Sequence, residues 1–77
     1  HPATSDECEA IFRRSAELEL KAQKISDPEV IRQRVAEARA AKGAKLMKAC
    51  VGKRITQRAM DCVREATSAK GLDTCLQ

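Results

Sequence analysis

The chain has 77 residues, a net charge of +4 and a single aromatic side chain, Phe12. A chain of this length forms one domain, here residues 1–77, and buries only about 60% of the surface that its unfolded form exposes. Alanine is the commonest apolar residue, so the core is poor in large side chains. Small folds of this kind usually need a covalent bond, a metal or a partner for stability. No apolar run is long enough to span a bilayer.

The first predicted helix runs from about Ser5 to Lys24. Thr4 and Glu7 have the spacing of a capping box in front of it, and we expect residues 1–4 to form a flexible N-terminus. Small and apolar residues then recur every three or four positions, which is typical of one helix face. They are Cys8, Ile11, Ser15, Leu18, Ala22 and Ile25, with Phe12, Ala16 and Leu20 beside them.

The second predicted helix begins near Pro28, after a short turn that makes it antiparallel to the first. Either Ser26, in a capping box with Glu29, or Asp27 can cap it. Its apolar side is predicted to comprise Val30, Ile31, Val35, Ala38, Ala41, Leu46, Ala49 and Cys50. Gly43 interrupts this pattern, which indicates a bend or a close neighbour, and Gly52 is expected to end the helix.

A shorter third helix is predicted after Thr56, which can cap it. Its inward residues are expected to be Ile55, Ala59, Cys62, Val63 and Ala66. Residues 67–71 break the helical pattern, and we expect Leu72 to anchor a final turn that carries Cys75, with Asp73 as a local cap. The sequence therefore predicts an all-α fold: an antiparallel helical hairpin plus a shorter third helix, in a disulfide-stapled three-helix bundle.

The four cysteines favour two disulfides over free thiols or a metal site. None of them forms a closely spaced pair, and the only histidine is residue 1, whereas zinc sites use close pairs. The helical hairpin brings Cys8 to the level of residues 45–50, which favours Cys8–Cys50 with Cys62–Cys75. The pairing Cys8–Cys62 with Cys50–Cys75 stays open as a rival. Disulfides indicate an extracytoplasmic location: the periplasm, the cell surface or outside the cell.

The pattern Cys8, Cys50, Cys62, Ala66, Leu72 and Cys75 resembles small four-cysteine helical domains of predicted secreted proteins and lipoproteins of myxobacteria. This resemblance covers most of the chain and implies an extracytoplasmic helical domain. It supplies no catalytic residue.

Catalytic chemistry finds little support in the sequence. There is no internal histidine, and the cysteine spacing does not suit a thiol oxidoreductase. Asp61 and Glu65 lie four residues apart, as expected for a solvated helix face. We therefore expect no enzymatic activity, no cofactor and no metal.

A basic segment is the best candidate site. Between Arg39 and Arg58 there are seven basic residues and no acidic one: Arg39, Lys42, Lys45, Lys48, Lys53, Arg54 and Arg58. These residues form either a solvated face, balanced partly by the acidic first helix, or a binding surface for an acidic protein or an anionic surface. The second reading predicts a non-enzymatic binding or structural module.

Two other functions would use the same positive charge. The first is a cationic membrane-active polypeptide, because cationic helices bind anionic bilayers. The second is a helical DNA-binding domain, with its turn at Gly52. Nucleic acid is disfavoured as a partner by the expected oxidising compartment and by the lack of aromatic side chains.

Overall fold

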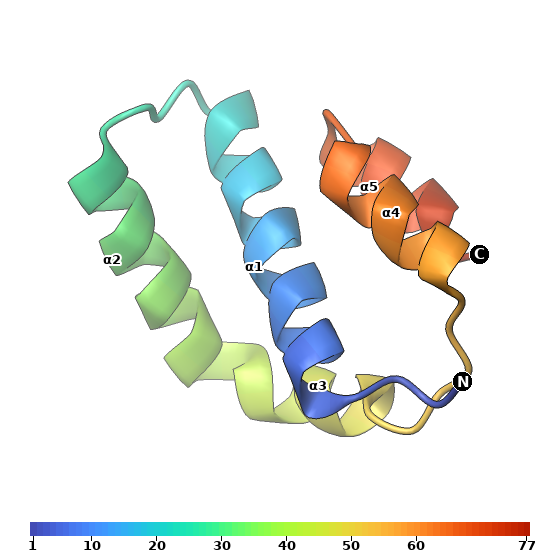
Figure 1. The fold of residues 1–77 in the computed structure, drawn as a ribbon. Coiled ribbons are helices and arrows are strands. Elements are labelled where there is room, and N and C mark those ends of the chain that lie inside the picture. The colour runs from blue at the N-terminus through green and yellow to red at the C-terminus, as the bar shows by residue number, and fades with distance from the viewer.

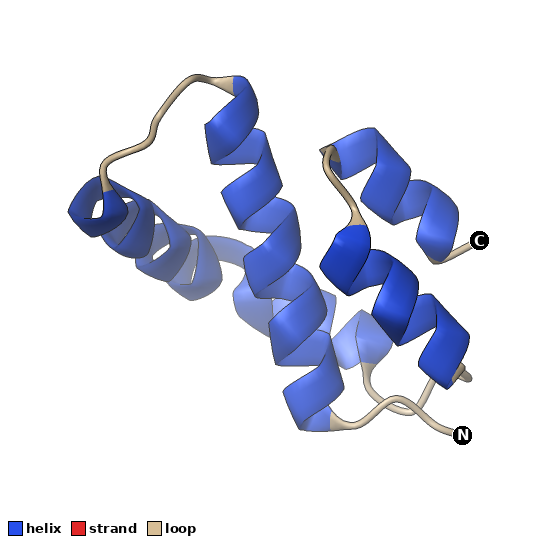
Figure 2. Ribbon diagram, turned by 45° about the horizontal axis from the view of Figure 1, so that its top comes forward, coloured by secondary structure: helices blue, strands red, loops and turns tan.

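The computed structural model describes residues 1–77 and contains only helices and loops, so the all-α prediction is confirmed. The elements are α1 (Ser5–Ala22), α2 (Pro28–Ala38), the π-helix η1 (Arg39–Gly43), α3 (Ala44–Cys50), α4 (Gln57–Glu65) and α5 (Ala69–Cys75). The central element is α1, which contacts α2, α3, α4 and α5. Figures 1 and 2 show α2 on one side of α1 and the pair α4–α5 on the other.

The helices begin at side chains that satisfy the free N–H groups of their first turns. Thr4 and Glu7 form the predicted capping box of α1, and Thr56 accepts a hydrogen bond from the N–H of Ala59 at the start of α4. Of the two candidate caps of α2, Asp27 is used: its side chain accepts from the N–H of Glu29 at 2.9 Å. These caps are local in sequence, which is why the sequence reveals them.

The predicted long second helix is interrupted. Residues 39–43 form the π-helix η1 between α2 and α3, and Figure 1 shows α3 turning away from the direction of α2 to cross the lower end of α1. A π-helical turn is a recognised cause of such a change in direction. The bend also breaks the predicted apolar side, because Ala41, Leu46 and Ala49 are exposed.

The C-terminal part contains two short helices, α4 and α5, which pack against each other. The segment expected to break the pattern instead starts α5, because the Ser68 side chain accepts a hydrogen bond from the N–H of Gly71 at 3.0 Å. Gly71 therefore lies inside the helix, and Ser68 is its cap in place of Asp73.

The core lies between α1, α4 and α5. Only 8 of the 77 residues are buried, and the central cluster consists of Leu18, Val63 and Leu72. No residue of α2 is buried. The helices thus pack around α1 with one small core, while the specific three-helix bundle arrangement is not confirmed.

Two disulfides cross-link the helices. Cys8–Cys50 joins α1 to α3 with 6.0 Å between the Cα atoms, and Cys62–Cys75 joins α4 to α5 with 5.7 Å. Both distances are ordinary for a disulfide, and no cysteine is free. The structure has the first of the two predicted pairings and not its rival.

The N-terminal residues, which we expected to be flexible, pair with the turn after α3. The N–H of Ala3 donates to the carbonyl of Lys53 at 2.6 Å, and the carbonyl of Ala3 accepts from Gly52 at 2.9 Å. Ala3 is buried. Gly52 has a φ of +90°, a conformation that favours glycine and ends α3 as predicted.

Candidate functional site

Six of the seven predicted basic residues form what we call the basic end of the molecule. They are carried by η1, α3, the following turn and the first turn of α4, which are consecutive in the chain; Figure 1 shows η1, α3 and the turn along the lower edge and the start of α4 above them on the right. Every one of them is exposed, and none belongs to an ion pair. The basic end comprises Lys42, Lys45, Lys48, Lys53, Arg54 and Arg58.

The seventh residue, Arg39, has a structural contact instead. Its Nε donates to both carboxylate oxygens of Glu9 at 3.0 and 3.1 Å, and its Nη2 approaches Oε1 at 2.5 Å. This hydrogen bond is the main cause of the lowered pKa of the Glu9 carboxyl. Partial burial acts in the opposite direction and raises the pKa, whereas the positive charges of Arg39 and Arg13 lower it further. The same contact raises the pKa of Arg39. Arg39 therefore joins η1 to α1, and we remove it from the predicted binding surface.

The acidic first helix forms no ion pair with the six residues of the basic end. Glu9 binds Arg39, and Glu7 contacts the His1 ring at 2.9 Å and completes the capping box. Direct pairing between the two charged regions is thus limited to Arg39 and Glu9. The remaining cations face solvent.

An apolar cleft of about 790 Å³ adjoins the basic end. Its walls come from α1, α3, the turn at 53–56, the start of α4 and the end of α5, and 13 of its 20 lining residues are hydrophobic. Lys53 and Arg54 also line it, and Asp73 is its only acidic residue. The Cys8–Cys50 disulfide lies in the wall and joins α1 to α3, so these two sides of the cleft are held together covalently.

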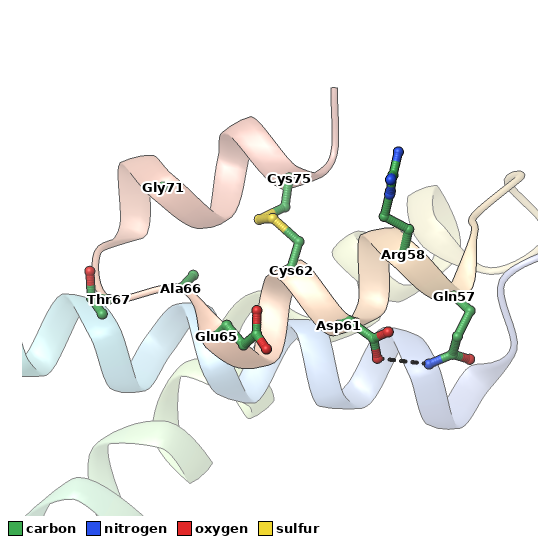
Figure 3. A pocket seen from close by; sticks show the side chains of 9 residues that line it. All are labelled: Gln57, Arg58, Asp61, Cys62, Glu65, Ala66, Thr67, Gly71 and Cys75. Carbon is green, nitrogen blue, oxygen red and sulfur yellow. Dashed lines mark hydrogen bonds between the residues drawn. A yellow bond between two sulfur atoms is a disulfide. The ribbon is translucent and has the colours of Figure 1, made fainter.

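A second, open groove of about 630 Å³ lies between α4 and α5 (Figure 3). The Cys62–Cys75 disulfide crosses it, and Arg58, Asp61 and Glu65 line it. Asp61 accepts a hydrogen bond from Gln57 at 3.1 Å and pairs with Arg64, and Glu65 is exposed. The groove therefore carries both positive and negative side chains at its surface.

The structure contains neither a metal-ligand cluster nor a membrane-spanning helix. No group of three or more histidine, cysteine, aspartate or glutamate residues is placed to hold a metal ion. None of the helices combines the length and the apolar character needed to cross a bilayer.

Comparison with family models, curated proteins and solved structures found no match for this chain. The resemblance of its cysteine pattern to the myxobacterial domains therefore stays a prediction. The function is argued below from the geometry of the basic end and the cleft.

One contact that positions these elements was not predictable from the sequence. Arg14 of α1 donates a hydrogen bond to the carbonyl of Ala66, the C-cap of α4, at 2.6 Å. A cation at this position also suits the negative end of the helix dipole. The partner is a backbone atom 52 residues away, and no periodicity or cap pattern indicates such a contact.

Proposed function

We propose that this protein is a non-enzymatic binding module of an extracytoplasmic compartment, and that its basic end binds an acidic protein. The observation that carries the proposal is the set of six exposed, unpaired cations on consecutive elements. A partner can contact these side chains without breaking any internal ion pair.

The physics of such a surface favours an acidic macromolecule. Clustered charges of one sign raise the local potential, speed the encounter with an oppositely charged partner and add specificity. Because exposed charges are screened by salt over about 8–10 Å at physiological ionic strength, binding should weaken as salt is added.

The disulfides support both parts of the proposal. Cys8–Cys50 attaches the end of α3 to α1, so the backbone that carries the lysines is held before a partner arrives, and a preorganised surface loses less entropy on binding. Two disulfides in a chain of this size also fit an oxidising, extracytoplasmic compartment.

The proposal is tested by charge reversal at the basic end. The triple variant Lys45→Glu, Lys48→Glu, Arg54→Glu should bind immobilised poly-L-glutamate at least about tenfold more weakly than the unmodified protein, since several charge contacts of a few tenths to 1 kcal/mol each are reversed. Biolayer interferometry at two salt concentrations provides the measurement, and circular dichroism checks folding.

A matched control separates the location of the charge from the net charge. The triple variant Arg13→Glu, Lys21→Glu, Lys70→Glu changes the net charge equally, at exposed positions outside the basic end. It should lose clearly less affinity. An equal loss in the two variants would contradict a defined binding surface.

Two further measurements distinguish the other functions that positive charge permits. Leakage of dye from anionic vesicles at the concentrations that bind poly-L-glutamate would favour a membrane-active polypeptide. Tighter binding to duplex DNA, with a steep dependence on salt, would favour a DNA-binding domain.

A further inference from the structure

The apolar cleft has the volume and lining of a ligand site. It is partly open to solvent and has a volume of about 790 Å³. Small-molecule sites typically enclose about 300–1,000 Å³ and are lined mostly by hydrophobic side chains with a few polar groups. The cleft meets both criteria.

Large apolar side chains on its walls are open to solvent. Leu46 of α3 is 47% exposed, and Leu76, which follows α5, is 42% exposed. Phe12 and Met47 also line the cleft and are half-buried. Covering these side chains removes apolar surface from water, which is favourable in proportion to the area covered. Methionine also adapts its shape to different apolar groups.

The charge at the cleft selects the kind of ligand that fits. Lys53 and Arg54 line it without an ion-pair partner, and Asp73 is the only acidic lining residue. A purely apolar ligand would leave Lys53 and Arg54 without a charged partner. A ligand that combines an apolar chain with a carboxylate would satisfy both the walls and the cations.

We propose that the cleft is a binding site for an amphipathic carboxylate of the fatty-acid class. The alkyl chain lies against Leu46, Met47 and Leu76, and the carboxylate lies beside Lys53 and Arg54. This site goes beyond the proposed function, because its apolar walls play no part in binding an acidic protein.

Isothermal titration calorimetry tests the chemical class of the ligand. The probes are octanoate, decanoate and dodecanoate, each used below its micelle-forming concentration. Affinity should rise about fourfold for each added CH₂ group that enters the cleft. Dodecyltrimethylammonium has the same alkyl chain with a positive head group and should bind at least about tenfold more weakly than dodecanoate.

The location is tested with neutral substitutions of exposed residues, which leave the net charge unchanged. The variant Leu46→Gln, Leu76→Gln should bind dodecanoate about tenfold more weakly, since part of the apolar wall is lost. Val51 is also a large exposed hydrophobic residue, at 46%, but it does not line the cleft. Val51→Gln should therefore change the affinity less than about twofold.

The proposal is overturned by affinities that do not depend on chain length, by equal binding of the cationic amphiphile, or by an equal effect of Val51→Gln. Sedimentation that shows a dimer abolished by the Leu46→Gln, Leu76→Gln pair would also overturn it, because a second copy would then occupy the cleft. Poly-L-glutamate binding should be unaffected by this neutral pair. Each proposal can therefore fail separately from the other.

Discussion

At the scale of single residues, Glu9, Arg39 and Gly43 form one unit. Gly43 has an ordinary helical φ of −63°, so its backbone conformation does not require glycine. The side chain of Arg39 limits the space instead: a Cβ at this position would lie 2.5 Å from Cδ of Arg39, and the three nearest atoms all belong to Arg39, so this side chain would have to move. Gly43 therefore leaves room for the arginine side chain that reaches Glu9.

This contact predicts a pH-dependent contribution from Glu9. The lowered pKa of Glu9 means that the folded state binds a proton less readily than the unfolded state, whose carboxyl titrates near 4.5. The stabilisation is complete above this pH and is lost as the pH falls through the lower folded value. Glu9→Gln should accordingly melt at a lower temperature than the unmodified protein at pH 7, and the difference should shrink below pH 4.5.

Thermal melts of both proteins across this pH range provide the measurement. Glu19→Gln is a suitable control, because Glu19 is exposed on α1 and forms no ion pair. A Glu9→Gln difference that stayed constant down to acid pH would show that the ion pair with Arg39 does not stabilise the fold.

At the scale of elements, the π-helix η1 converts one long helix into two differently directed ones. It carries Arg39 at its start and Gly43 at its end. We infer that the arginine contact and the glycine stabilise this segment together, since an alanine would occupy the space of the arginine side chain.

A double-mutant cycle tests this coupling. Alanine is about 1 kcal/mol more favourable than glycine inside a helix, so Gly43→Ala should stabilise the Arg39→Ala variant by roughly this amount. In the unmodified protein the same change displaces Arg39 from Glu9, and it should give no gain or a loss. Urea denaturation of the four proteins measures the coupling; equal effects of Gly43→Ala in both backgrounds would contradict it.

The elements that could be predicted are those whose signals are local. Thr4, Thr56 and Gly52 mark helix ends through side chains or backbone conformations within a few residues, and the hairpin connection places Cys8 near Cys50. The position of the core was not predicted because α2 and α4 both carry apolar residues, and only packing decides on which side of α1 the buried core forms. The cleft and the Arg14 contact likewise depend on groups distant in sequence, whereas Gly43 indicated the bend that the π-helix makes.

At the scale of the whole molecule, the small number of buried residues leaves stability dependent on the cross-links. With 8 buried residues out of 77, the hydrophobic contribution is small for a chain of this length. The two disulfides close segments with sequence separations of 42 and 13 residues. On the chain-entropy model these contribute about 4 and about 3 kcal/mol, which is comparable with the whole stability of a small domain.

Chemical reduction tests this dependence most directly. Thermal unfolding should be followed by circular dichroism with and without a phosphine reductant, with alkylation and mass spectrometry to verify that all four thiols are released. We predict that the reduced chain loses its cooperative transition or melts far below the oxidised protein. An unchanged melting temperature of the fully reduced protein would contradict the account, because the helices would then hold together without their cross-links.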